Sequence, residues 1–236
     1  MELSDAVTRV ADSRAEMTMT LIDGSGGQRV RTLVMLTKLK EGGSDNRRRL
    51  NFTGPADIKG TATLLIENSD ADDDMWIFLP TVKKVRRLVA DNKRDSFVGS
   101  DLTFGDIIGH KPADWTHALM REDTVEGRAV WVIESLPKDE AIKERTGYGR
   151  RVSWIDRETF VPLKLEFWDE SGAPLKTSTT GKVVAVEGAP GKWQFLHVEA
   201  HHLRTGHRTI LDFDSYRANV GLGDAVFTPR TLEREP

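Results

Sequence analysis

The stretch MWIFLPTVKKVRRLV, residues 75–89, decides the fold class. It places five apolar residues in succession, breaks them with Pro80, and then interleaves apolar residues with four cations. Val82, Val85 and Val89 fall at helical spacing, which alone would indicate an amphipathic helix. However, β-branched valines are frequent here and the Pro-Thr connection has hairpin length, so we interpret the segment as two antiparallel strands.

Period-two alternation dominates the rest of the chain. Met17, Met19 and Leu21 alternate with polar residues, DGSGG supplies a turn, and QRVRTLVMLTKL begins the next strand. About a dozen short strands joined by hairpin turns predict a meandering antiparallel sheet in a single domain, 1–236. Beyond those already named, the predicted strands cover 47–53, 61–68, 116–122, 128–135, 149–156, 161–169, 175–186, 192–205 and 207–216.

Helical signals are confined to two segments. A short N-terminal helix is predicted over 3–13, with Ser4 as a candidate cap. A second helix of one or two turns is predicted after Thr103, because Asp106 follows three residues later and Gly109 can end the helix. Such a short helix either fills space between strands or forms a mobile lid over a cavity.

A sheet with so few helices must cover its inner face by curling. It can close into a barrel or wrap around a small helical plug. Segments 33–36, 64–66 and 130–133 carry apolar residues on both faces, so we expect these strands to be buried from two sides. The fold class is therefore mainly β, with an antiparallel sheet curled around short helices.

The composition excludes several functions. The 236 residues contain no cysteine, which removes disulfides, thiolate catalysis and cysteine-based zinc sites. A net charge of −3 argues against a dedicated nucleic-acid binder. No run of 18 apolar residues occurs, and the start MELSDAVTRV has no signal-peptide pattern, so no membrane span or signal peptide is predicted. If the protein is exported, this sequence is its mature portion.

Catalytic motifs are absent from the sequence, so no enzyme activity and no cofactor is predicted. One alternative is a metal-dependent hydrolase, because His197, Glu199 and His201 would share one face of a strand. A solvent-facing polar row on a half-exposed strand would give the same pattern.

Cations cluster after Pro80. They can form a solvated outer face, or a rim that docks an acidic partner or lipid headgroups. A nucleic-acid interface is less favoured, because no aromatic residues alternate with these cations. The rim candidates are Lys83, Lys84, Arg86 and Arg87.

Five stretches, in this order along the chain, resemble a known family: SRAEMTMTLID (13–23), FTGPADIKGTATLL (52–65), MWIFLPTVKKVRRL (75–88), SFVGSDLTFGDI (96–107) and FTPRTLE (227–233). The sequence is similar to the outer-membrane lipoprotein-sorting proteins, a branch of the LolA-like periplasmic carriers. The resemblance implies an incomplete antiparallel β-barrel around a few helices, with an apolar cavity for acyl chains. It also implies a monomeric, non-enzymatic carrier between an inner-membrane transporter and an outer-membrane acceptor. The plug or lid residues would be Thr103, Phe104, Ile107 and Ile108.

A lipid carrier needs a large apolar surface. Moving an acyl chain into water costs on the order of 0.8 kcal/mol per methylene, or about 13 kcal/mol for ~16 carbons. A preformed apolar cavity offsets this cost without a catalytic group. Each candidate for its wall could equally be ordinary core: Met17, Met19, Met35, Trp76, Phe78, Trp131 and Phe167.

Two functional hypotheses follow from the sequence. The first is a periplasmic carrier that binds a lipid or lipoprotein acyl chain in an apolar cavity. The alternative is an envelope protein-interaction module with a packed core and a basic docking patch. An internal cavity would favour the carrier, and a filled core would favour the module.

Overall fold

The structure is a computed structural model that describes residues 1–89 and 93–233. Its described strands form one 13-stranded antiparallel sheet in the order β6-β5-β4-β3-β2-β1-β13-β12-β11-β10-β9-β8-β7. The strands are β1 (Asp12–Ile22), β2 (Gln28–Leu39), β3 (Asn46–Gly54), β4 (Ala62–Ile66), β5 (Asp74–Leu79), β6 (Lys84–Leu88), β7 (Trp115–Val125), β8 (Arg128–Pro137), β9 (Arg150–Asp156), β10 (Pro162–Trp168), β11 (Pro174–Ala185), β12 (Trp193–His202) and β13 (Arg208–Ala218).

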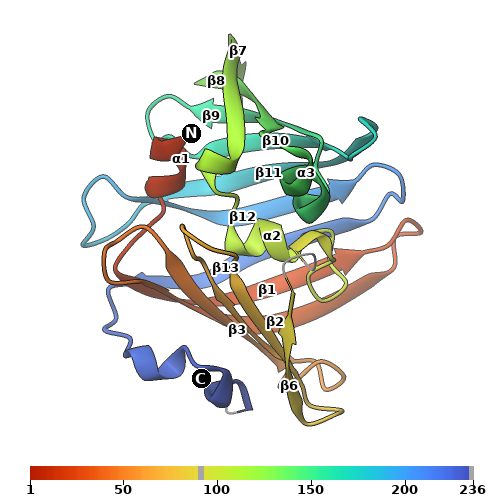
Figure 1. The fold of residues 1–236 in the computed structure, drawn as a ribbon, viewed down its shortest axis with the longest axis vertical. Helices are drawn as coiled ribbons and strands as arrows, with labels where there is room; N and C mark the ends of the chain where they lie inside the picture. The colour runs from red at the N-terminus through yellow and green to blue at the C-terminus, as the bar shows by residue number, and fades with distance from the viewer. Residues whose placement is uncertain (90–92, 234–236) are drawn as a thin grey trace.

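The sheet is an incomplete barrel. Only β1 and β13 pair out of chain order, and they place the first and last strands side by side in the middle of the sheet (Figure 1). Within the described part of the chain, β6 and β7 each have one strand neighbour, so they are the two edges. The predicted mainly β fold, curled but not closed, is confirmed.

The segment that decides the fold is a hairpin, as predicted. Strands β5 and β6 pair antiparallel with Phe78 opposite Val85 and Met75 opposite Leu88. The helical spacing of the valines is therefore overridden by strand pairing.

Six short helical segments accompany the sheet in the described residues: α1 (Glu2–Ala6), α2 (Phe104–Ile108), α3 (Glu140–Thr146), and the 3-10 turns η2 (Pro112–Asp114), η3 (Asp224–Val226) and η4 (Pro229–Glu233). The helix predicted over 3–13 is too long, because Asp12 and Ser13 already pair with β2. A single short helix has little intrinsic stability, whereas an extended β1 gains pairing on both sides.

Helix α3 was missed by the sequence prediction. Its N-cap is Asp139, whose side chain accepts a hydrogen bond from the Ile142 amide. Gly147 ends the helix in the left-handed conformation that glycine adopts easily. Both signals are present in the sequence, but the helix is only two turns long.

The main core lies between the concave face of the sheet and α2, which lies in front of the middle strands (Figure 1). Phe104 and Ile108 of α2 are buried there, and Phe104 makes an edge contact with Phe97 at 5.3 Å between ring centroids. The sheet contributes apolar side chains from its first strands and from β12 and β13, including Met19, Leu33, Leu50, Leu65, Ala200 and Leu211.

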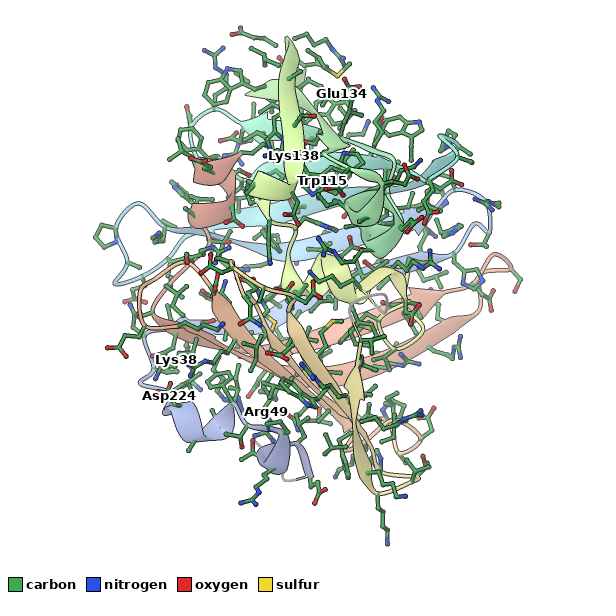
Figure 2. All side chains as sticks on the ribbon, viewed as in Figure 1. Lys38, Arg49, Trp115, Glu134, Lys138 and Asp224 are labelled. Atoms are coloured by element: carbon green, nitrogen blue, oxygen red, sulfur yellow. The ribbon has the colours of Figure 1, made fainter. Side chains whose placement is uncertain are left out.

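A C-terminal segment, residues 219–233, covers the convex face of β2 to β6 (Figure 2). Phe227 and Leu232 are buried against Val34 and Leu64. Polar contacts hold the segment as well, because Lys38 pairs with Asp224 at 2.9 Å and Arg49 donates to the Val226 carbonyl at 3.3 Å. Strands β2 and β4 are thus buried from two sides, as their composition predicts.

Among the residues that the structure describes, no helix has the length and apolar composition needed to cross a bilayer.

Candidate functional site

A cavity of about 340 Å³ lies between α1, α2 and the concave face of the sheet. Its wall is mostly apolar and is built from β1, β2, β3 and β10 to β13. Four of the predicted wall residues line it, namely Met17, Met19, Met35 and Phe167. The other apolar lining residues are Val10, Leu33, Leu50, Phe97, Leu102, Ile107, Pro162, Leu165, Phe195, Val198, Leu211, Phe213 and Tyr216.

Three predicted wall residues lie outside this cavity. Trp76 and Phe78 pack in the convex cluster that the C-terminal segment covers. Trp131 contacts Phe160 at 5.9 Å between ring centroids and lies under the Arg157 guanidinium. Alternation along a strand tells which residues share a face, but not which face becomes the concave one.

Helix α2 forms one side of the cavity. Of the four predicted lid residues, Ile107 faces the cavity, while Phe104 and Ile108 are buried in the core behind it. Thr103 is the N-cap and forms a complete capping box with Asp106. Each accepts a hydrogen bond from the other's backbone amide, at 2.8 and 3.0 Å.

A buried polar cluster joins the first turn of α2 to β11, in the C-terminal half of the sheet. Lys176 of β11 donates to the Asp106 carboxylate at 2.5 Å and to the Asp101 carbonyl at 3.0 Å. The Tyr148 hydroxyl donates to the same carboxylate at 3.0 Å, and the His110 ring lies 3.2 Å from it. Only 3% of the Lys176 side chain and 10% of the Asp106 side chain are exposed.

The cluster shifts the pKa values of its members. Burial alone would raise the pKa of Asp106, but the Lys176 ammonium and His110 hold it well below its usual range. Burial opposes the charge of Lys176, yet the Asp106 carboxylate raises its pKa above the ordinary value. Burial, and then the nearby Arg151 charge, lower the pKa of His110 to about 4, so its ring is neutral at pH 7. Burial and the Asp106 charge raise the pKa of Tyr148 to about 12.

The other end of α2 is held by β3. The Arg48 guanidinium donates to the carbonyl of Ile108 at 2.6 Å and pairs with Glu67. Glu67 also pairs with Arg9 at 3.0 Å, and Arg9 pairs with Asp5 of α1 at 2.7 Å. Both ends of α2 are therefore joined to the sheet by charged side chains, and α1 is joined to the same network.

A smaller polar compartment of about 160 Å³ adjoins the apolar cavity. The two share Asp5, Arg9, Gly109 and His110 as lining residues. The remaining lining of the compartment is Ser44, Asp45, Glu67, Ser69, Asp73, Lys111, Pro112 and Ala113. The apolar cavity and the polar compartment are therefore neighbours beside α1.

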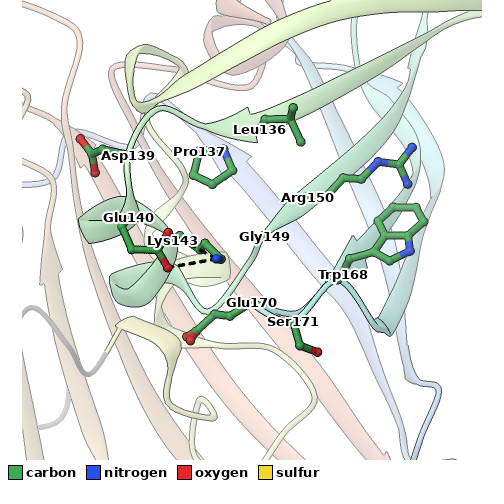
Figure 3. Close-up of a pocket in the computed structure, with 11 residues that line it drawn as sticks. Leu136, Pro137, Asp139, Glu140, Lys143, Gly149, Arg150, Trp168, Glu170 and Ser171 are labelled. Carbon is green, nitrogen blue, oxygen red and sulfur yellow. Dashed lines mark hydrogen bonds and ion pairs between the residues drawn. The ribbon is translucent and has the colours of Figure 1, made fainter.

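Another hollow, about 630 Å³, is an open groove between α3 and the β10–β11 turn (Figure 3). Its charged lining groups are paired, as in the 3.0 Å contact of Lys143 with Glu140 and the 2.6 Å contact of Arg150 with Glu134. The Arg150 guanidinium also lies 4.1 Å from the Trp168 ring. The groove is open to solvent, whereas the cavity under α2 is apolar and sheltered, so we take the latter as the candidate site.

The predicted basic rim lies on the β5–β6 hairpin, at the edge of the sheet. Lys83, Lys84, Arg86 and Arg87 are all exposed. Arg87 pairs with Asp74 at 2.5 Å and lies over the Trp76 ring. Within residues 1–89 and 93–233, the other three make no ion pair.

Two of the three candidate metal ligands on β12 are engaged with other side chains. His197 lies 2.8 Å from Asp212, and Glu199 lies 3.6 Å from Arg208. In the described portion of the chain, no group of three or more metal-binding side chains is arranged to hold an ion.

Sequence reasoning missed the Asp106 cluster. Lys176, Tyr148 and His110 come from three separate elements, and Lys176 is 70 residues from its partner. The one available signal was Lys176 itself. It lies on the same strand face as Ser178 and Thr180, so it places a positive charge on the concave face of the sheet. Nothing in the sequence indicates its partner.

A curled antiparallel sheet with a short helix across its concave face and an apolar cavity beneath it defines a LolA-like fold. A domain from Vibrio parahaemolyticus, described as an outer membrane lipoprotein-sorting protein, is 28% identical, with a TM-score of 0.90 over 99% of this chain and 96% of that one. A DUF1329 family protein from Desulfovibrio piger is also 28% identical, with a TM-score of 0.89 over 98% and 96%. A LolA superfamily protein from Nitrosomonas europaea shares the fold at 23% identity, with a TM-score of 0.72 over 96% and 94%.

A family model described as an uncharacterized protein matches residues 44–234, and the chain belongs to this LolA-like family. A search of the curated proteins found no match.

Proposed function

We propose that this protein is a carrier that shelters an acyl chain of a lipid or lipoprotein and moves it through the periplasm toward the outer membrane. The observation that supports this function is the apolar cavity under α2. A sheltered wall of this kind offsets the roughly 0.8 kcal/mol that each methylene would cost in water. Binding and release of a chain need no catalytic group, so we propose no enzyme activity.

The proposed partners of the carrier are suggested by its similarity to the Vibrio domain, which is described as an outer membrane lipoprotein-sorting protein. We propose that a monomer receives its cargo from an inner-membrane transporter and passes it to an outer-membrane acceptor.

The wall and the roof have separate roles in this proposal. Met17, Met19 and Met35 supply flexible, polarizable side chains that adapt to chains of different shape. Phe167 closes the wall near β11, and Ile107 of α2 contacts the chain from above. Helix α2 acts as the lid, with Thr103 fixing its first turn.

The basic rim supplies a docking surface. Lys83, Lys84 and Arg86 are exposed and unpaired in the described residues, so their charge is available to anionic lipid headgroups. Cations on a short edge strand also prevent that edge from pairing with other chains. Both effects favour a reversible electrostatic contact over strand addition.

The experiment compares two methionine-to-tryptophan variants. Met35→Trp fills the cavity, whereas Met120→Trp places the same bulk on the exposed strand β7. Native mass spectrometry after gentle extraction, followed by titration with a 12-carbon monoacylglycerol, measures chain binding. We expect the unmodified protein and Met120→Trp to bind, and Met35→Trp to lose at least about ten-fold in affinity.

Absence of bound or exchangeable lipid from the unmodified protein would overturn the carrier proposal. Such a result would favour the interaction module with a basic docking patch, whose interior does not accept hydrocarbon.

A further inference from the structure

We infer that strand β7 is a docking edge, which takes up an uncharged, extended segment of a partner polypeptide as an added strand. Main-chain hydrogen bonds give such a complex its affinity, and side chains beside the edge select the segment. The edge is distinct from the apolar cavity, so this inference goes beyond the proposed function and does not depend on it.

The two edges of the sheet differ in length and charge. Strand β6 has five residues and carries Lys84, Arg86 and Arg87, and a short cationic edge resists the addition of another strand. Strand β7 has 11 residues, of which 116–124 are all exposed, so both of its faces reach solvent. Figure 1 shows β7 at the end of the sheet, where its hairpin with β8 projects from the molecule. The protection seen at β6 is therefore missing at β7.

The first half of β7 is uncharged at pH 7. Residues 115–120, WTHALM, include one titratable side chain, His117, whose ring nitrogens lie 2.8 Å from the Ser135 hydroxyl and 3.0 Å from the Pro112 carbonyl. Partial burial of this ring lowers the pKa of His117 below its usual value. A docked segment would find no charge here to pair with its own, so an uncharged segment fits best.

The charged second half is already paired. Arg121 lies 3.1 Å from Asp123, and Glu122 lies 3.0 Å from Arg157. Between the two halves, Leu119 and Met120 are exposed apolar side chains on an edge strand, which is a position that favours association with other chains. An added strand would cover part of this apolar surface.

The hydrogen bonds of the hairpin indicate which main-chain groups point outward. The Lys138 amide donates to the Asp114 carbonyl at 3.0 Å, one position before Trp115, which lies opposite Pro137. Bonded and non-bonded positions alternate along an antiparallel pair. The amides of His117 and Leu119 therefore point away from β8, toward the position of a further strand.

A bulge sets the length of the regular edge. The register with β8 shifts between Leu119 and Arg121, so regular pairing covers Trp115–Leu119, about 17 Å of strand. A short extended segment matches this length. A second copy of the chain fits less well, because antiparallel pairing of two complete β7 strands would place their bulges opposite each other.

The test uses an uncharged heptapeptide of alternating valine and threonine with blocked ends as the probe. Fluorescence anisotropy of the dye-labelled peptide gives its affinity for the full chain at pH 7, and amide hydrogen exchange followed by NMR gives the site. We expect the peptide to slow exchange at His117 and Leu119 at least about ten-fold. The same peptide, N-methylated at alternate amides, should bind at least about ten-fold more weakly, because it lacks the donors and cannot approach the edge.

A matched pair of variants tests the edge from the protein side. Leu119→Pro removes an outward amide, which is the position where an edge strand tolerates proline, whereas Leu119→Ala keeps the amide and only shortens the side chain. We expect the proline variant to bind the heptapeptide at least about ten-fold more weakly and the alanine variant to stay within about three-fold of the unmodified protein. The N-methylated peptide tests the same hydrogen bonds with the unmodified protein, so the result does not depend on the folding of the proline variant.

The inference is overturned if the heptapeptide does not bind, if the N-methylated peptide binds equally well, or if exchange slows at β6 instead of β7. Analytical ultracentrifugation of the protein alone tests the other occupant. A dimer in which His117 and Leu119 are already protected would show that a second copy of the chain covers the edge, and would overturn the assignment to a partner segment. None of these results concerns the cavity, so the lipid titration of the proposed function is decided separately.

Discussion

The Lys176 ammonium on β11 lies 2.5 Å from the Asp106 carboxylate on α2, and both side chains are largely buried. This contact joins the roof of the cavity to the C-terminal half of the sheet. Because Tyr148 and His110 contact the same carboxylate, one acidic group holds the first turn of the helix in place.

Removing the ammonium should destabilise the protein strongly. Lys176→Met leaves the Asp106 charge buried without its main partner, and we expect a loss of about 3–5 kcal/mol in the free energy of unfolding. Urea denaturation measures this loss. Lys182→Met, on the same strand but with 68% of its side chain exposed, is the control and should change stability by less than about 1 kcal/mol.

The double variant Asp106→Asn with Lys176→Met checks the cause. Because neither partner of the ion pair remains charged, it should lose less stability than Lys176→Met alone. An equal or larger loss would show that the ion pair is not the origin of the effect.

Stability should fall below neutral pH partly because of His110. Burial lowers its pKa in the folded state to about 4, below the ordinary 6.5 of the unfolded chain. Between these values the unfolded state binds more protons, so protonation favours unfolding and stability decreases as pH falls. The full difference between the two pKa values corresponds to a decrease of about 3 kcal/mol in the free energy of unfolding.

Urea denaturation at pH 7 and at pH 4.5 measures this contribution. His110→Gln should lose less stability than the unmodified protein on acidification, whereas His207→Gln, an exposed histidine, should behave like the unmodified protein. Identical pH profiles for all three proteins would contradict the assignment.

The C-terminal segment should contribute to the stability of the whole sheet. Phe227 is 4% exposed and packs against the convex face, so Phe227→Ala is expected to cost about 3–5 kcal/mol. Leu119→Ala on β7, where the side chain is 62% exposed, should cost less than about 0.5 kcal/mol. Similar unfolding midpoints for the two variants would show that the segment does not stabilise the sheet.

The basic rim should bind anionic membranes. Replacing Lys83, Lys84 and Arg86 with Glu should weaken binding to vesicles with anionic lipid by at least about a hundred-fold, because each cation near such a surface contributes about 1 kcal/mol and each glutamate is repelled by it. Co-sedimentation with vesicles at two salt concentrations measures the loss of binding and shows whether salt screens the interaction. The control makes the same charge change at the exposed residues Lys182, Arg204 and Arg217, and equal losses in both triple variants would contradict a specific rim.

Local patterns in the sequence predicted the elements well where the signal lies within a few residues. The period-two alternation predicted the strands, and Thr103 with Asp106 predicted the capping box of α2. The hairpin at 75–89 required weighing valine content against helical spacing, and the pairing of β6 with β5 confirms the strand interpretation. Helix α3 was missed although Asp139 and Gly147 mark its ends.

The site itself depended on contacts between distant residues. Met17 and Met35 line the cavity, whereas Trp76 and Phe78 face the C-terminal segment, and all four occur in similar apolar strands. The sequence of a single strand does not show which of its faces will be concave, because the direction in which the sheet curls is set by all of its strands together.

The sequence by itself determined that this chain forms an antiparallel sheet with few helices, since alternation and turn residues act locally. Tertiary structure alone decided which side of the sheet became the inner wall, and that Asp106 meets Lys176 across 70 residues. The physical reason is that burial and ion pairing depend on neighbours in space, and the pairing of β1 with β13 sets those neighbours only once the sheet has formed.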